Sequence, residues 1–468
     1  MKSPSNAFVL HEFDKVAAKQ KTLSENQINL IIKHHPVLKK SRRLRLLFIW
    51  LALEGHRKDK DTDAILLSYQ LLTLFMGLTK GNCNTEELLR EFKEKIAPDF
   101  EWRDYWYQGQ KCRQVITSGI SNIAFEYLNE GDKRMYVEDL TYFSDEKLLQ
   151  VCDTLRNTAK KFHYPYSDQR KLANYLHNLP VELFSLPLQL NFNAAYEMAM
   201  EREDRKQAVA LLFQIRDMPL PFYFSSRNEN SLCPRIFSPS IPMLPTVIRK
   251  VLYPHWIDLD LKNCQLAIAS GIFKIDRLQD YLYDGGNIWE DLLNYMSIPE
   301  GRRGETKKVF KQGVYSLVYG MDLSVVERNI TNGLENLSIE KSVRFLDFPL
   351  LKVTAERLQT VKNEIRKTKK AQGAYGEMKF DSKTMDIDSF LSCLIQTYEL
   401  ALIVPCYNLV INNLRRNSST ESLIINHQHD GFSIMLHHEA EKEKAIQSYR
   451  NAVRRKSEEL GIITSLVG

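Results

Sequence analysis

Two strand-like segments lie far apart in this chain, and their separation constrains the fold more than any other feature. Residues 256–261 alternate polar and apolar side chains, and residues 422–437 hold two apolar runs around a turn. Between these segments the apolar residues follow helical spacing. A sheet that uses both segments must therefore bring distant residues together. We expect an α+β protein, mostly helical, with a small antiparallel sheet.

Helical spacing also dominates the first half of the chain, and its 468 residues are enough for two to four domains. Segments with helical apolar spacing are 28–32, 44–54, 63–76, 85–96, 118–129 and 145–217. The aromatic and basic segment 102–113 would stack on bases or pack between helices. Prolines make 223–245 rich in turns, and 247–252 is an apolar run typical of a strand.

The composition indicates a soluble globular protein, with 44% hydrophobic and 26% charged residues. No apolar run predicts a bilayer span and no signal-peptide core begins the chain, so we expect a cytoplasmic protein without a membrane partner. The number of cysteines is odd, at 7, and none forms a CxxC pair, which favours reduced thiols.

The net charge of +6 is mild, but basic residues gather in 302–311 and 352–370. Both stretches have helical spacing. Basic helices are typical of proteins that contact a polyanion through its phosphates, and they are also typical of a solvated surface face.

The first strand-like segment ends in acidic residues. Asp258 and Asp260 lie on one face of residues 256–261 because side chains alternate along a strand. A carboxylate among apolar residues needs a partner, which is either a divalent cation or a Lys or Arg side chain.

A helix expected over 301–321 carries a repeating stripe. Lys307, Lys311, Tyr315 and Tyr319 recur every four residues and would form one face. The opposite face is apolar and would pack inward, and Gly320 would end the helix. Such a stripe either binds a triphosphate and a base or is a solvated face.

The second strand-like segment predicts a hairpin. Residues 422–428 and 432–436 are apolar runs, and Asp430-Gly431 between them is a strong turn signal. The alternate histidines His427 and His429 are weak indications of a metal site.

In this order, the three segments resemble the motifs of the family A nucleotide polymerases. That group includes bacterial DNA polymerase I and the single-subunit phage and mitochondrial RNA polymerases. Asp260 with Gln265 and Leu266 is similar to the first motif, an Asp followed five and six positions later by Glu-Leu. This offset selects Asp260 over Asp258.

The other two motifs follow at the intervals that the family uses. Lys307-x3-Lys311-x7-Tyr319-Gly320 is similar to the Arg-x3-Lys-x7-Tyr-Gly motif of the fingers helix. His429-Asp430 is similar to the His-Asp-Glu motif. The resemblance covers 235–468.

The resemblance implies two catalytic magnesium ions, with manganese as a substitute, held by Asp260, Asp430 and the Leu261 carbonyl. It implies that Lys307 and Lys311 hold the triphosphate and that Lys311 protonates the leaving pyrophosphate. Further implied nucleotide contacts are Tyr315, Tyr319 and Gln265. Implied primer-template contacts are His429, Gln396, Arg235 and Arg249.

The resemblance also implies a right-hand polymerase layout with helical fingers and a helical thumb. The expected parts are an N-terminal helical domain of unknown role (1–140), a thumb-like region (141–234), the first part of the palm (235–275), the fingers (276–384) and the second part of the palm (385–468). The N-terminal helices would be available to a protein partner.

Three residues depart from the family pattern. Gly431 stands where the DNA polymerases have Glu, a residue that the RNA polymerases also lack. Gln265 stands in place of the Glu beside the sugar, and its bulk would still obstruct a 2′-hydroxyl. Lys307 in place of Arg keeps the charge but loses the bidentate fork.

We therefore expect a DNA polymerase that adds dNTPs to a primer 3′-hydroxyl by two-metal-ion nucleotidyl transfer. No acidic cluster in the first 230 residues matches a proofreading exonuclease, so none is expected. The alternatives are a single-subunit RNA polymerase or primase, and a non-catalytic nucleic-acid-binding protein with a decayed palm. A bacterial, plasmid or phage setting suits a small enzyme of this kind.

Overall fold

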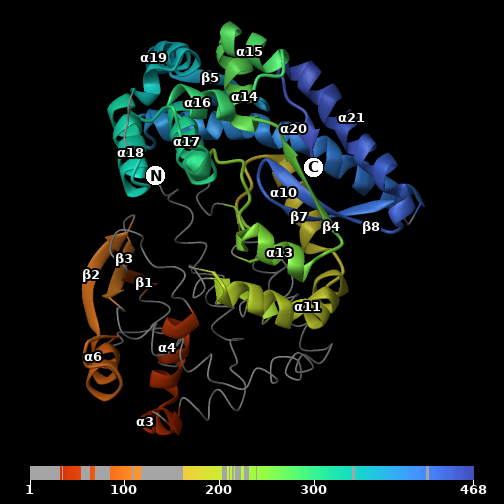
Figure 1. The fold of residues 1–468 in the computed structure, drawn as a ribbon. Coiled ribbons are helices and arrows are strands. Elements are labelled where there is room, and N and C mark those ends of the chain that lie inside the picture. The colour runs from red at the N-terminus through yellow and green to blue at the C-terminus, as the bar shows by residue number, and fades with distance from the viewer. Residues whose placement is uncertain are drawn as a thin grey trace. The chain divides into compact units, whose positions relative to one another are not determined.

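The two predicted strand segments form one sheet in the computed structural model (Figure 1). Its strand order is β7-β8-β4-β9, with β4 at Trp256–Leu261, β7 at Ser422–His427, β8 at Gly431–Leu436 and β9 at Leu466–Val467. β7 pairs with β8 and β4 pairs with β9, each antiparallel. Distant segments thus meet in one sheet, as the sequence predicts.

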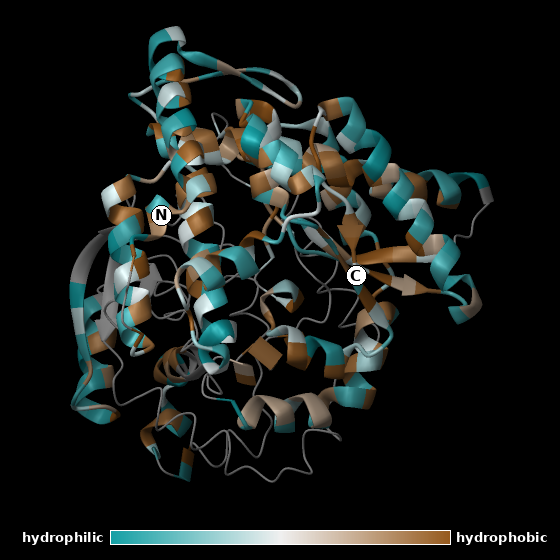
Figure 2. Ribbon diagram, turned by 45° about the horizontal axis from the view of Figure 1, so that its top comes forward, coloured by the Kyte–Doolittle hydropathy of each residue, from teal (hydrophilic) through white to brown (hydrophobic). Residues whose placement is uncertain are grey.

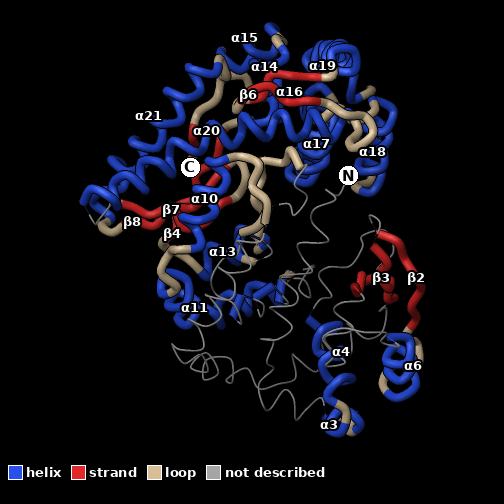
Figure 3. Tube along the Cα trace, turned by 180° about the vertical axis from the view of Figure 1, so that it is seen from behind, coloured by secondary structure: helices blue, strands red, loops and turns tan. Residues whose placement is uncertain are grey.

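The structure describes a defined set of residues: 32–33, 35–53, 64–68, 85–107, 110–116, 162–202, 208–209, 211–212, 215–216, 223–225, 231–238, 240–339, 343–417 and 421–468. The predicted helix 118–129 lies outside them, as does 28–32 apart from Ile32. Among the described residues helices predominate and strands form three small sheets (Figure 3).

The chain divides into two compact units. The first comprises Met1–His163, Ala173–Glu229 and Phe237–Trp256, and the second comprises Tyr164–Leu172, Asn230–Ile236 and Ile257–Gly468. Helix α10 (Ser167–His177) contributes to both units.

The first unit contains helices and a small sheet. Its helical elements are α3 (Val37–Lys40), α4 (Arg42–Leu53), α6 (Thr85–Lys95), α11 (Glu182–Met200), η3 (Ile241–Met243) and α13 (Thr246–Leu252). Its strands are β1 (Ala64–Ser68), β2 (Glu101–Tyr107) and β3 (Gln110–Ile116), in the order β1-β3-β2. Helices α11 and α13 pack together, and Asn191 donates a hydrogen bond to the Leu252 carbonyl at 3.1 Å.

The predicted N-terminal helices are partly wrong. Helices α4 and α6 confirm the segments 44–54 and 85–96. Residues 64–68 are instead the edge strand β1, and Glu101–Tyr107 and Gln110–Ile116 are the paired strands β2 and β3. Short apolar runs have no decisive period, and pairing with β3 settles the conformation of β1.

The strand predicted at 247–252 is a second error, because these residues form helix α13. Ile248 and Leu252 are both fully buried and lie four residues apart, which is the helical spacing of a packed face. Tertiary packing outweighs the β-branched composition here.

The second unit combines its sheet with many helices. These are α14 (Cys264–Phe273), α15 (Asp276–Tyr283), α16 (Ile288–Tyr295), η4 (Glu300–Arg302), α17 (Arg303–Val318), α18 (Leu323–Asn336), η5 (Phe345–Asp347), α19 (Pro349–Thr368), α20 (Ile387–Asn417), η6 (Glu439–Glu441) and α21 (Lys442–Leu460). A hairpin of β5 (Lys370–Gly373) and β6 (Gly376–Lys379), which the sequence did not predict, follows α19.

Helices α14 and α20 form the centre of the second unit. Nine of the residues in α14 are buried, and the helix packs against α15, α17, α19 and α20. A helix that is apolar on all sides belongs in a core. Hydrophobic residues are concentrated along the sheet beside the C-terminus and hydrophilic ones along the outer helices (Figure 2).

Helix α20 corrects one expectation of the sequence. Its residues Ile387–Arg416 are long and apolar enough to span a bilayer by length and composition. Within the protein, 78% of its apolar window is buried, as in the core helix of a globular unit.

Candidate active site

Asp260 and Asp430 come together at the junction of β4 and the β7–β8 turn. The Leu261 N–H donates a hydrogen bond to the Asp430 carbonyl at 2.9 Å. Asp260 lies in β4, Asp430 directly precedes β8, and β4 and β8 are neighbours in the sheet. The structure therefore places side by side the two carboxylates that the sequence separates widely.

The turn between β7 and β8 differs in detail from the predicted one. Gln428 N–H donates to the Gly431 carbonyl at 2.9 Å, so His429 and Asp430 occupy the centre of the turn and Gly431 begins β8. His429 has a left-handed φ of 64°. The Asp430-Gly431 dipeptide correctly predicts a hairpin, but the central residues of the turn are His429 and Asp430, one position earlier.

Gly431 is required by a close approach of Asp260. A β-carbon at position 431 would lie 1.8 Å from Asp260 Oδ1 and 2.7 Å from the Leu259 carbonyl oxygen. The Asp260 carboxylate thus occupies the space that any side chain at 431 would need. This explains why a Glu cannot stand there in this chain.

Gly431→Ala is expected to destabilise the protein, because the Asp260 carboxylate must move by an ångström or more to make room for the β-carbon. Overpacking should cost ~1–3 kcal/mol of unfolding free energy. Gly301→Ala is the matched control, since a β-carbon there meets no atom within 4 Å. Equal unfolding free energies of the two variants in urea would contradict the placement of Asp260.

The electrostatics of the pair favour a cation. The pKa of Asp430 is raised to about 6, mainly by burial and next by the nearby carboxylates of Glu399 and Asp260. Ionised Asp430 is therefore both desolvated and repelled by two like charges. A divalent cation between Asp260 and Asp430 would relieve both penalties.

Asp258 is excluded from this pair by its own partners. It accepts hydrogen bonds from Ser433 Oγ at 2.6 Å and Gln428 Nε2 at 3.4 Å. Its carboxylate is thus engaged by polar side chains of the hairpin, which supports Asp260 as the acidic residue of the site. Among the described residues, no group of three or more His, Cys, Asp or Glu side chains is arranged to hold a metal ion.

The α17 helix has the two faces that the sequence predicts. Phe310, Val314, Leu317 and Val318 are buried, whereas Lys311 is exposed and Tyr315 and Tyr319 are half-buried. Burial raises the pKa of Tyr315 most, and the negative charges of Asp430, Glu399 and Asp260 raise it further. The tyrosine face of α17 therefore lies near the two carboxylates.

Gly320 ends α17 as predicted, with a left-handed φ of 87°. The buried Lys362 side chain of α19 fixes this end of the helix. Its Nζ donates to the Gly320 carbonyl at 2.5 Å and pairs with Asp388 of α20 at 2.8 Å. Through Lys362, helices α19 and α20 hold the end of α17, where Tyr319 lies.

Trp289 of α16 is a part of the site that the sequence did not reveal. Lys311 Nζ lies 5.6 Å from the centre of its ring, and Tyr315 packs edge-on with ring centres 6.1 Å apart. Its indole N–H donates to Asn263 Oδ1 at 3.2 Å. The cation–π contact holds the Lys311 ammonium close to the tyrosine face. No motif in the sequence marks this tryptophan.

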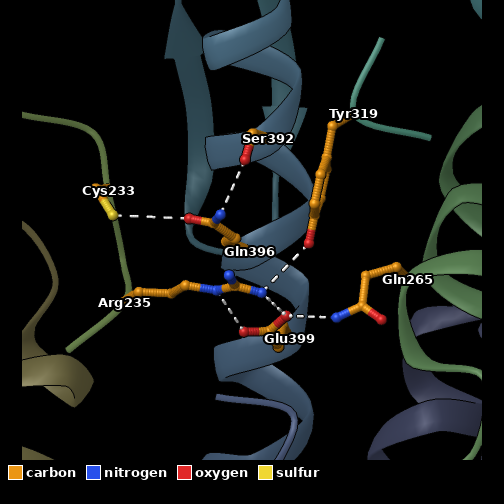
Figure 4. A network of polar contacts seen from close by, with 7 residues as sticks. All are labelled: Cys233, Arg235, Gln265, Tyr319, Ser392, Gln396 and Glu399. Atoms are coloured by element: carbon orange, nitrogen blue, oxygen red, sulfur yellow. Dashed lines mark hydrogen bonds and ion pairs between the residues drawn. The ribbon is translucent and has the colours of Figure 1, made fainter. Parts of the chain in front are cut away.

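A buried network joins four of the predicted residues (Figure 4). Arg235 binds the Glu399 carboxylate through Nε at 2.9 Å and Nη2 at 2.7 Å, and Nη2 also donates to the Tyr319 hydroxyl at 3.3 Å. Gln265 Nε2 donates to Glu399 Oε2 at 3.2 Å. Gln396 reaches the network through the segment that carries Arg235, since its Oε1 accepts from Cys233 Sγ at 3.6 Å.

Glu399 connects this network and was missed by the sequence analysis. It lies on α20 with a side chain only 2% exposed. The available signal was a single acidic residue within an apolar helical run, which indicates a buried partner.

His427 at the end of β7 is buried, whereas His429 in the turn is half-buried. Burial lowers the pKa of His427 to about 3, with a further contribution from Arg235, and its Nδ1 lies 3.2 Å from the Tyr407 hydroxyl. Burial also lowers the pKa of His429 well below its usual value. Arg249 lies in the first unit, where Nη1 donates to the Leu244 carbonyl at 3.4 Å.

Buried His427 predicts a loss of stability in acid. His427 binds a proton near pH 6.5 when unfolded but only near pH 3 when folded, so its contribution is complete above pH 6.5 and is lost as pH falls through that range. The slope is at most about 1.4 kcal/mol per pH unit for each such histidine. Asp430, with a raised pKa, acts in the opposite direction below about pH 6.

The difference between wild type and His427→Asn isolates this contribution. Urea unfolding at pH 7.5, 6.5, 5.5 and 4.5 should show a smaller acid-induced loss in the variant. Identical slopes in both proteins would contradict a neutral, buried His427.

Comparisons with known proteins give a weak structural likeness. No protein-family model matches the chain, and no curated protein matches it. Among solved structures, it is similar to the POL domain of Pol1 from M. smegmatis in a complex with DNA primer-template and dNTP. The two share 12% sequence identity with a TM-score of 0.41, and the match covers 60% of this chain and 50% of that chain. The site rests on the contacts above and not on this likeness.

Proposed function

We propose that this chain is a template-directed DNA polymerase that adds dNTPs to a primer 3′-hydroxyl. The observation that carries the proposal is the meeting of Asp260 and Asp430 beside the tyrosine face of α17. Carboxylate oxygens that leave room for substrate phosphates are the usual protein ligands of magnesium. The sequence motifs and the geometry support the same pair of residues.

Two magnesium ions, when bound, would lower the pKa of the primer 3′-hydroxyl and stabilise the pyrophosphate leaving group. Asp260 and Asp430 would hold these ions, with the Leu261 carbonyl as a further ligand and manganese as a substitute metal. The remaining ligands would be substrate phosphate oxygens and water.

Lys307 and Lys311 would hold the triphosphate of the incoming nucleotide. The primer 3′-hydroxyl would lose its proton to water, its oxygen would attack the α-phosphorus, the bond from that phosphorus to the bridging oxygen would break, and Lys311 would give a proton to the leaving pyrophosphate. The cation–π contact with Trp289 keeps the Lys311 ammonium near this position. Tyr319 would stack against the base, with Tyr315 beside it, and Gln265 would lie against the sugar.

The primer-template contacts are proposed for His429, Gln396, Arg235 and Arg249. The palm would comprise 235–275 and 385–468, the fingers 276–384 and the thumb 141–234. The region 1–140 would serve a partner protein or the template, and no exonuclease is proposed.

The proposal is tested with primed and unprimed templates, each given dNTPs or rNTPs in magnesium buffer. Primed dNTP extension should be the strongest of the four reactions. Strong unprimed RNA synthesis would favour an RNA polymerase or primase. Absence of any magnesium-dependent incorporation would favour a non-catalytic nucleic-acid-binding protein.

A further inference from the structure

Glu399 is a buried carboxylate at the centre of the Arg235 network. Arg235 compensates its charge with two hydrogen bonds of 2.9 and 2.7 Å in a bidentate arrangement. A buried charge is tolerated only with such compensation. The pair does not exhaust the hydrogen-bonding capacity of the carboxylate, which has further lone pairs available.

Gln265 uses part of this remaining capacity, and the contact fixes which way its amide points. Nε2 donates to Glu399 Oε2 at 3.2 Å. An ionised carboxylate only accepts hydrogen bonds, so it selects the NH2 group and directs Oε1 away from itself. Gln265 is 4% exposed, and within the described part of the chain its Oε1 is buried without a hydrogen-bond partner.

The position of Gln265 makes its orientation important. It lies in the first turn of α14, which begins at Cys264, shortly after Asp260 and Leu261 end β4. The Arg235 guanidinium that holds Glu399 also contacts the Tyr319 hydroxyl at 3.3 Å. One acid on α20 therefore joins the start of α14 to the end of α17.

We infer that Glu399 is a positioning residue that holds the Gln265 side chain against the sugar of the incoming nucleotide and so sets its discrimination between dNTPs and rNTPs. This inference rests on the proposed function. Without the Glu399 hydrogen bond, Gln265 can adopt other rotamers and obstructs a 2′-hydroxyl less. Glu399 acts through Gln265 and touches neither nucleotide nor metal.

A double-mutant cycle of Glu399→Gln and Gln265→Ala tests the inference. The measured quantity is the kcat/KM ratio for a dNTP over the matching rNTP in primed extension. Each single variant should lower this ratio about tenfold. In both variants the hydrogen bond between Gln265 and the charged Glu399 carboxylate is lost. The double variant should show no further loss. An unchanged ratio in Glu399→Gln, or an equal loss in both Gln265 backgrounds, would overturn the inference.

Two further variants separate positioning from folding. Glu399→Asp keeps the charge that Arg235 requires but shortens the side chain, so its ratio should fall between wild type and Glu399→Gln. Glu458→Gln changes an exposed acid on α21, 68% exposed, and should leave the ratio unaltered. Thermal melting identifies the variants that fold. If Glu399→Gln does not fold, an unchanged ratio in Glu399→Asp overturns the inference.

Calorimetric titration makes the result independent of turnover. Each variant is titrated with a dNTP and its rNTP in the presence of magnesium chloride and primer-template. If wild type fails to incorporate any nucleotide, the proposed polymerase activity is wrong. The double-mutant cycle then uses the ratio of dNTP to rNTP affinities in place of kcat/KM, and this ratio still decides the role of Glu399. Absence of dNTP-over-rNTP binding selectivity in a wild type that does not turn over would overturn the Glu399 inference.

Discussion

Asp430→Asn is expected to reduce primer extension about a hundredfold to a thousandfold. The substitution removes a negative charge from the site where the catalytic metals are proposed to bind, and a single preorganised electrostatic group contributes about a hundredfold to a thousandfold to rate. The shape of the side chain is conserved, so the turn between β7 and β8 should persist. Single-turnover extension of a primed template measures the loss.

The same variant is expected to be more stable than wild type. The folded protein raises the Asp430 pKa to about 6 through burial and the charges of Glu399 and Asp260. For a carboxyl with a raised pKa, stability falls as pH rises from the unfolded value through the folded one. At pH 7 the ionised form therefore costs stability, and Asn should recover ~1–3 kcal/mol of unfolding free energy.

This pairing of outcomes distinguishes a metal-binding carboxylate from a structural one. A site that concentrates negative charge reduces the stability of the fold in exchange for function. Asp258→Asn is the control, because Ser433 and Gln428 already engage that carboxylate. Extension by Asp430→Asn at the wild-type rate would contradict the assignment, as would an equal loss in Asp258→Asn.

Several features of the second unit could be predicted because they are local or strongly periodic. The burial pattern along α17 follows the 3.6-residue repeat of its sequence. The hairpin at 422–437 was marked by two apolar runs and a turn dipeptide. The choice of Asp260 over Asp258 depended on an offset within one short motif and stays a prediction.

Other features depend on contacts between distant segments, and the sequence carries no local signal for them. Strand β9 has two residues and exists because β4 offers a free edge. Trp289 and Glu399 matter through Lys311 and Arg235, which lie on other elements. The need for Gly431 arises from the Asp260 carboxylate, which no spacing rule could reveal. Residue type and order indicated the chemistry, but only the packed structure shows the partners.

Arg235→Met is expected to cost ~3–5 kcal/mol of unfolding free energy, because it leaves the Glu399 carboxylate buried and without its compensating charge. For a unit of this size the melting temperature should fall by roughly 10 °C. Differential scanning calorimetry and urea unfolding at pH 7 measure the change.

A surface pair provides the comparison for Arg235. On α21, Arg454 Nε lies 4.0 Å from Glu458 Oε1, and the two side chains are 67% and 68% exposed. Arg454→Met should change stability by less than ~1 kcal/mol, since water screens such pairs. Replacing both members of the buried pair, with Arg235→Met and Glu399→Leu together, should recover much of the lost stability. Because the double replacement also removes the acid that orients Gln265, it should restore folding without restoring dNTP selectivity. Recovery of both together would mean that the pair serves only the fold.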